Sequence, residues 1–236
     1  MSATYEKKFG AFIDEYKKSW WLLIGWFLLF ILPGFLILSS DAAVKEHEPI
    51  AILAGLLLLP IPMLIIFLDR LRSRVSLYEN GIIQNTLFGR SEVKFDANSK
   101  FRYKVFSESI SGISTGTKTK LQVANNNQKV NISSSYVGVE VLHDDFREKE
   151  LELVYPAMKK AYLEGKTIDF NALKLKANQF VFNKKTIAFN EIKDIALQSG
   201  HLQINKKGKR LPFAVIAVSE ISNLYTLLQL FHDLQA

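Results

Sequence analysis

The chain of 236 residues contains no cysteine. This absence excludes disulfides, thiolate metal sites, cysteine nucleophiles and the lipid-bearing cysteine of a lipoprotein signal. The metalloprotease motif HExxH is missing as well. Because no thiol nucleophile and no metal-binding motif is present, the sequence predicts a protein that is not an enzyme and that uses no metal and no cofactor.

Charged residues are missing from two long stretches. These are WWLLIGWFLLFILPGFLIL at residues 20–38 and IAILAGLLLLPIPMLIIFL at residues 50–68. A helix needs about 20 apolar residues to cross the hydrocarbon of a bilayer. The sequence therefore predicts a transmembrane hairpin over residues 20–74, with spans at about 20–38 and 50–68. The first stretch is longer than the apolar region of a cleaved signal peptide, which favours an anchor.

Lysine and arginine are unevenly distributed around these stretches. Four lysines precede the first one, a single lysine lies in the loop, and arginines at 70, 72 and 74 follow the second one. Such cations are retained on the cytoplasmic side of a membrane. We therefore expect an integral membrane protein with two spans and both termini in the cytoplasm, anchored in a bacterial cytoplasmic membrane.

Residues 1–19 are predicted to form a cytoplasmic amphipathic segment. Phe9, Phe12, Ile13 and Tyr16 recur at helical spacing and form one apolar stripe. Two interpretations stay open for this stripe: a helix lying in the membrane interface, or an extension of the first spanning helix.

From Val75 onward the sequence has the short alternating runs that are typical of strands. Asn80-Gly81 is a strong turn dipeptide, and Phe101–Val105 alternates apolar with basic residues, as a half-buried strand does. The stretch Ser107–Lys120 is rich in serine, threonine and glycine, which predicts a flexible hairpin loop.

Helical composition follows over Phe146–Glu164 and stops at Gly165. Further short strands come next, and Glu220–Leu234 closes the chain with an amphipathic helix. The order strands, helix, strands, helix predicts two units, at residues 75–165 and 166–236. Short motifs recur in both: LYENGI at 77–82 is similar to LKANQF at 175–180, and LQV at 121–123 to LQI at 202–204.

In this order, these motifs resemble an uncharacterised family of membrane-associated proteins that is known only as a domain of unknown function. The resemblance also includes Phe189-Asn-Glu-Ile192, Gly200-His-Leu-Gln-Ile204 and Ile221-Ser-Asn-Leu224, and it covers about Leu77 to Leu234. It implies tandem units similar to the pleckstrin-homology (PH) fold. The fold class expected is thus a two-helix transmembrane hairpin plus a mainly-β (α+β) cytoplasmic region of tandem PH-like units, each a curved antiparallel sheet with a C-terminal helix.

Positive charge is concentrated in the second of these units. Residues 166–236 carry ten Lys/Arg and five Asp/Glu, a net +5 (10 − 5) out of +7 for the chain. Six cations lie in two predicted turns and are the candidate lipid- or anion-binding residues: Lys184, Lys185, Lys206, Lys207, Lys209 and Arg210. If the turns are neighbours, they form one cationic rim; the alternative is ordinary solvated surface.

The acidic run after His143 is interpreted as the N-terminus of a helix rather than as a metal site, because adjacent positions do not converge on one ion. The expected function is therefore a membrane-anchored, non-catalytic binding or scaffold module. Its expected partners are a lipid bilayer, a protein and anionic lipid headgroups, with no nucleic acid. The alternative is a regulatory or accessory subunit of a membrane transporter or channel assembly.

Overall fold

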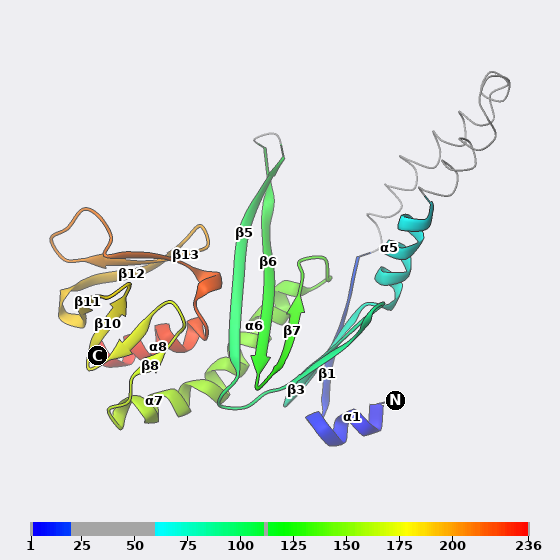
Figure 1. The fold of residues 1–236 in the computed structure, drawn as a ribbon, viewed down its shortest axis with the longest axis horizontal. Coiled ribbons are helices and arrows are strands. Elements are labelled where there is room, and N and C mark those ends of the chain that lie inside the picture. Colours follow the sequence, from blue (N-terminus) through cyan, green and yellow to red (C-terminus); the bar gives the residue numbers. More distant parts are fainter. Residues whose placement is uncertain (1, 20–59, 111–112, 236) are drawn as a thin grey trace.

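The computed structural model describes residues 2–19, 60–110 and 113–235, and over these residues the chain is mainly β (Figure 1). Its strands form four antiparallel sheets, with the orders β1-β2-β3-β4, β5-β6-β7, β11-β10-β9-β8 and β12-β13-β14. The strands of the first two sheets are followed in sequence by α6, η1 and α7, and those of the last two by α8. A four-stranded sheet, a three-stranded sheet and a helix therefore follow one another twice.

The strands are β1 (Phe12–Lys17), β2 (Arg74–Tyr78), β3 (Gly81–Thr86), β4 (Gly89–Lys94), β5 (Lys100–Ile110), β6 (Ile113–Asn125), β7 (Gln128–Ile132), β8 (Ile168–Asp169), β9 (Lys174–Lys176), β10 (Gln179–Phe182), β11 (Lys185–Ala188), β12 (Ile192–Gln198), β13 (His201–Lys206) and β14 (Ala214–Ala217). The helices are α1 (Ser2–Phe9), α5 (Pro60–Arg72), α6 (Val139–Lys149), η1 (Glu150–Val154), α7 (Tyr155–Leu163), η2 (Phe189–Glu191), η3 (Val218–Glu220) and α8 (Leu224–Gln235).

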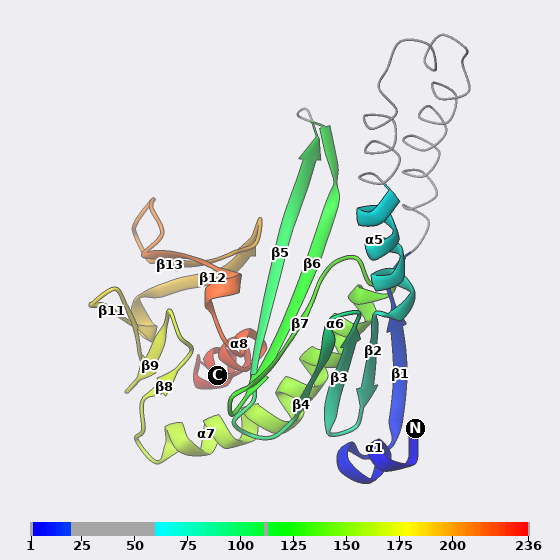
Figure 2. The same cartoon turned by 45° about the vertical axis from the view of Figure 1, so that its right-hand side comes forward.

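The first sheet joins segments that are far apart in the sequence, because β1 pairs with β2. Tyr16 lies opposite Val75, and both are buried. Figure 2 shows the four strands side by side, with α5 beyond one end of the sheet. The helical stripe predicted over residues 9–16 is wrong from Phe12 onward, since pairing with β2 overrides the 3.6-residue spacing.

The prediction of a transmembrane hairpin is wrong. No helix within residues 2–19, 60–110 and 113–235 is long and apolar enough to cross a membrane. Helix α5 is the described part of the second predicted span; its 13 residues rise about 20 Å, short of the ~30 Å of hydrocarbon, and its last turn carries Arg70 and Arg72.

The predicted location is wrong for the same reason. That prediction placed two spans in a bacterial cytoplasmic membrane, with both termini in the cytoplasm. Hydropathy depends only on the order of apolar residues in the sequence and does not fix the bounds of a helix. Residues 20–59, which hold the first predicted span and the start of the second, lie outside the described part of the chain.

The second sheet contains the longest strands of the described chain. The register between β5 and β6 continues from Lys100–Ala124 to Ile110–Ile113, with one shift after Glu108. The loop predicted over Ser107–Lys120 is therefore largely strand. Backbone ladder bonds do not depend on side-chain identity, so a Ser/Thr-rich stretch can extend a hairpin that its apolar neighbours have already aligned.

The predicted helix over 146–164 is confirmed and begins earlier than expected, at Val139. It contains a π-helical turn, η1, directly before Tyr155-Pro156. Proline lacks an N–H and its ring crowds the preceding turn, and a π turn relieves that conflict. Gly165 ends the helix as predicted, with φ at +80°.

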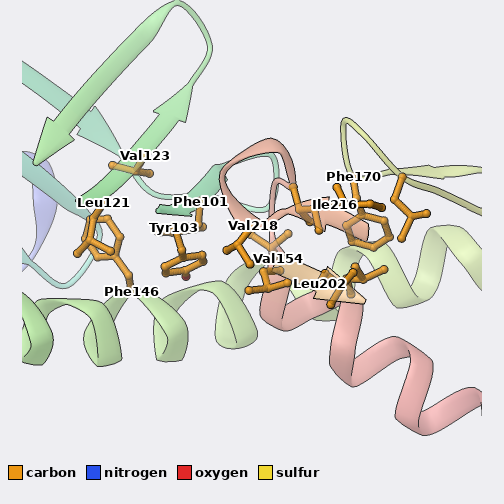
Figure 3. Close-up of a cluster of buried hydrophobic side chains, with 14 of the residues drawn as sticks. Phe101, Tyr103, Leu121, Val123, Phe146, Val154, Phe170, Leu202, Ile216 and Val218 are labelled. Carbon is orange, nitrogen blue, oxygen red and sulfur yellow. The ribbon is translucent and has the colours of Figure 1, made fainter. Parts of the chain in front are cut away.

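One cluster of buried apolar side chains passes through both halves of the chain (Figure 3). The rings of Phe101 and Phe146 meet edge to face, with centroids 5.4 Å apart. The same cluster includes Val154 from η1 and Leu202 and Ile216 from the C-terminal half. The two halves therefore share one continuous core.

Asn223 connects these halves through hydrogen bonds as well. Its Oδ1 accepts from the backbone N–H of Phe101 at 2.8 Å, and its Nδ2 donates to the carbonyl of Ser99 at 3.2 Å. Its own backbone N–H donates to the carbonyl of Phe101 at 2.8 Å. The start of α8 is thereby fixed to the start of β5.

Candidate functional site

The two basic turns predicted from the sequence lie at different places in the C-terminal half. Lys184 lies in the tight turn between β10 and β11, with φ at +66°, and Lys185 begins β11. Lys206 ends β13. Lys207, Lys209 and Arg210 follow in the connection to β14 and are exposed.

The structure does not bring the two turns together. The backbone N–H of Lys207 donates to the carbonyl of Glu191, and Glu191 lies in η2, directly after β11. Lys185 begins that strand, and the four residues of β11 are about 10 Å long at 3.3 Å per residue. Lys185 and Lys207 therefore lie toward opposite ends of β11.

Lys206 already has a partner within the protein. Its Nζ donates to Oε1 of Glu191 at 2.7 Å. This contact is the main cause that lowers the pKa of the Glu191 carboxyl below its ordinary value. The pair fixes η2 to the end of β13, and so Lys206 positions its neighbour Lys207 rather than offering a free cation.

A groove of about 680 Å³ opens beside this pair, at the end of the β10–β11 hairpin that is remote from Lys184. We call it the C-terminal groove. It is lined by Lys193 and Lys207, by the amide-bearing residues Asn178, Gln179, Asn190 and Gln235, and by the apolar residues Ala177, Ala188, Phe189, Ile192 and Leu234. Oδ1 of Asn178 already accepts a hydrogen bond from the hydroxyl of Tyr162.

The apolar lining is fixed by the packing of α8 against the hairpin. The ring of Phe189 packs against Phe180 and Phe231, with centroids 4.9 and 5.1 Å apart. Phe189 and Ile192 are buried, so the groove has a rigid apolar base. Lys193 and Lys207 are exposed at its edge, and Lys207 makes no ion pair with the described residues.

The C-terminal groove is suited to holding a ligand. Amide side chains both donate and accept hydrogen bonds, and lysines attract carboxylates. Its described lining has no carboxylate, imidazole, hydroxyl or thiol side chain for general acid–base or nucleophilic chemistry. Nucleophilic lysines are desolvated, whereas both lysines here are exposed.

Sequence reasoning missed a buried carboxylate, Glu150, where the two halves meet. Its side chain accepts hydrogen bonds from the hydroxyl of Tyr103 at 2.8 Å and from the backbone N–H of Thr226 in α8 at 2.6 Å. Burial raises the pKa of Glu150 to about 7, although these donors act in the opposite direction. Its position in a helical stretch rich in charge gave no sign of burial.

The prediction that the acids after His143 serve a helix N-terminus is wrong, because α6 begins at Val139 and His143, Asp144 and Asp145 lie after its first turn. Nε2 of His143 lies 3.1 Å from the hydroxyl of Tyr225, and Asp145 accepts from the hydroxyl of Tyr16 at 2.8 Å. Among residues 2–19, 60–110 and 113–235, no group of three or more His, Asp or Glu side chains could hold a metal ion. These side chains connect elements of the fold.

Comparisons with known proteins add a family and no activity. No curated protein and no solved structure matches the chain. A family model, described as a family of unknown function (DUF6585), matches residues 1–236. Because that match covers the whole sequence, the chain belongs to the family of unknown function DUF6585.

Proposed function

We propose that the protein is a non-catalytic binding module whose C-terminal groove takes a segment of a partner protein. The observation that carries this proposal is the composition of the groove, whose lining combines two lysines and four amide-bearing residues with five apolar residues. Binding sites combine an apolar concavity with a few polar groups that fix orientation. The described lining offers that combination without a general base.

The chemistry of the lining indicates what the partner segment contains. Amides pair with the N–H and C=O groups of a peptide backbone, and an apolar side chain of the partner fits the base formed by Phe189 and Ile192. An acidic residue next to it would meet Lys193 and Lys207. Lys209 and Arg210 extend the positive potential beyond the rim, and such potentials steer association.

Lys184 and Lys185 would contact an anion only on a separate surface, because they lie at the other end of the hairpin. Anionic lipid headgroups would compete with the partner segment for Lys193 and Lys207. An accessory role in a transporter or channel assembly depended on the two spans and is not proposed.

We also propose that the two halves correspond to PH-like units, as the sequence resemblance implies. The support is the repeated order of a four-stranded sheet, a three-stranded sheet and a helix. The boundary after Gly165 follows the end of α7.

Site-specific photo-crosslinking in the full chain tests the proposed function. A photoreactive amino acid is placed at Asn178 or at Lys207, which line the groove from different connections, and at Lys94 on β4 as a control. The proposal expects one protein to be cross-linked from both groove positions and not from position 94. Equal cross-linking from all three positions, or none from the groove, would contradict it.

A further inference from the structure

The outer face of the β5–β6–β7 sheet carries a dense group of cations. Alternate residues of β5, Lys100, Arg102 and Lys104, are on the side of the sheet opposite to the buried Phe101 and Tyr103. Lys118 and Lys120 on β6 and Lys129 on β7 complete the set. We call these six residues the basic sheet face.

The strand register places the six cations on one surface. Lys104 lies opposite Lys120, and Lys100 lies opposite Ala124, which in turn pairs with Lys129. Within residues 100–104, 118–124 and 129–133, every charged residue is a cation. Residues directly opposite one another in a sheet have neighbouring side chains, so the positive charges of this face lie close together.

A shallow groove of about 300 Å³ crosses the same face. Its lining includes Arg102, Lys104, Gln122 and Asn131. Nε of Arg102 is buried and has no hydrogen-bond partner among the described residues. Arg102 itself lines the groove, and arginine favours bidentate pairing of its guanidinium with a carboxylate.

We propose that the basic sheet face binds an acidic segment of a protein in an extended conformation. Alternate residues of a strand are about 6.8 Å apart, and alternate residues of an extended peptide have the same spacing. Carboxylates on one side of an acidic peptide therefore match Lys100, Arg102 and Lys104 one for one. Gln122 and Asn131, whose side-chain amides are hydrogen-bonded to each other, also line the groove.

Single-stranded nucleic acid fits this face less well. Its recognition relies on bases that stack on exposed aromatic side chains. Phe101 and Tyr103 are the aromatic residues in these segments, and they are 0% and 1% exposed. This surface lies on elements other than those of the C-terminal groove, so it goes beyond the function proposed above and does not depend on it.

Fluorescence anisotropy of the full chain with a labelled peptide of alternating Asp and Ser tests the inference. The double variant Arg102→Gln/Lys104→Gln is compared with Lys174→Gln/Lys176→Gln, which also removes two alternate cations from one strand, β9. We expect the first variant to bind the peptide at least about tenfold more weakly at low salt and the second to bind as the wild type does. Unchanged urea midpoints would show that both variants are folded.

Three outcomes would overturn the inference. These are no binding of the peptide, equal binding by both variants, or tighter binding of oligothymidylate that is lost in the Arg102→Gln/Lys104→Gln variant. The last result would assign the face to nucleic acid. The variant Lys193→Gln/Lys207→Gln separates the two proposals, since it alters the C-terminal groove and should leave peptide binding on the basic sheet face unchanged.

Discussion

Glu150 should make the stability of this protein depend on pH near neutrality. Its carboxyl is 0% exposed, and burial raises its pKa from the ordinary 4.5 to about 7. The folded chain therefore holds this proton more tightly than the unfolded chain does. The contribution of Glu150 is fully present below about pH 4.5 and is lost as pH rises through about 7.

The size of the effect follows from the difference between the two pKa values. One pKa unit corresponds to about 1.4 kcal/mol, so a difference of about 2.5 corresponds to roughly 3 kcal/mol. Above pH 7 the ionised carboxylate keeps its bonds from Tyr103 and Thr226, but it remains desolvated. Because pH 5 is already slightly above the ordinary pKa of 4.5, we expect the free energy of unfolding to be lower at pH 8 than at pH 5 by about 2–3 kcal/mol from Glu150 alone.

The variant Glu150→Gln tests this argument, because glutamine has the shape of protonated glutamate and does not titrate. Urea unfolding of the full chain is followed by circular dichroism at about pH 5 and about pH 8. Relative to the wild type, Glu150→Gln should gain about 2–3 kcal/mol in free energy of unfolding between these pH values. Glu148→Gln is the control, since Glu148 is exposed on the same helical stretch. A constant difference between Glu150→Gln and the wild type at both pH values would refute the reasoning.

Three further substitutions test the fold. Asn223→Ala removes the acceptor of the buried backbone N–H of Phe101 and places alanine at a φ of +57°, which is strained for alanine. Urea unfolding should show a loss of about 2–4 kcal/mol in free energy of unfolding, and a loss below 1 kcal/mol would contradict the role assigned to Asn223. Phe146→Ala removes a fully buried ring and should cost about 3–5 kcal/mol by the same assay, whereas a neutral result would refute its place in the core. Gly81→Ala should lower the melting temperature, because a Cβ there would lie 2.8 Å from the carbonyl oxygen of Val93; an unchanged melting temperature would contradict this contact.

Much of the β-rich region was predictable because its strands bury one face. The alternation in Phe101–Val105 follows from that condition, and the turn before Gly81 is where the sequence predicted it. The basic sheet face is part of the same alternation, since Lys100, Arg102 and Lys104 are its polar residues. The net charge of the first half did not indicate this face, because the acidic residues of α6 and η1 offset these cations in that net charge.

Other features were beyond a local analysis of the sequence. Strand β1 forms by pairing with a segment that begins more than fifty residues later, and its own spacing favours a helix. Glu150 is buried only because α8 and β5 meet over η1. The C-terminal groove likewise combines the β9–β10 turn, η2 and the end of α8, and no short motif joins these segments.

The most direct test of the proposed function is co-isolation of the full chain with its partner, measured by quantitative mass spectrometry. The variant Lys193→Gln/Lys207→Gln alters the C-terminal groove, and Lys94→Gln/Lys160→Gln removes two exposed lysines that do not line it. The account predicts that the protein cross-linked from positions 178 and 207 is lost with the first variant and retained with the second. Equal recovery with both variants would contradict the account.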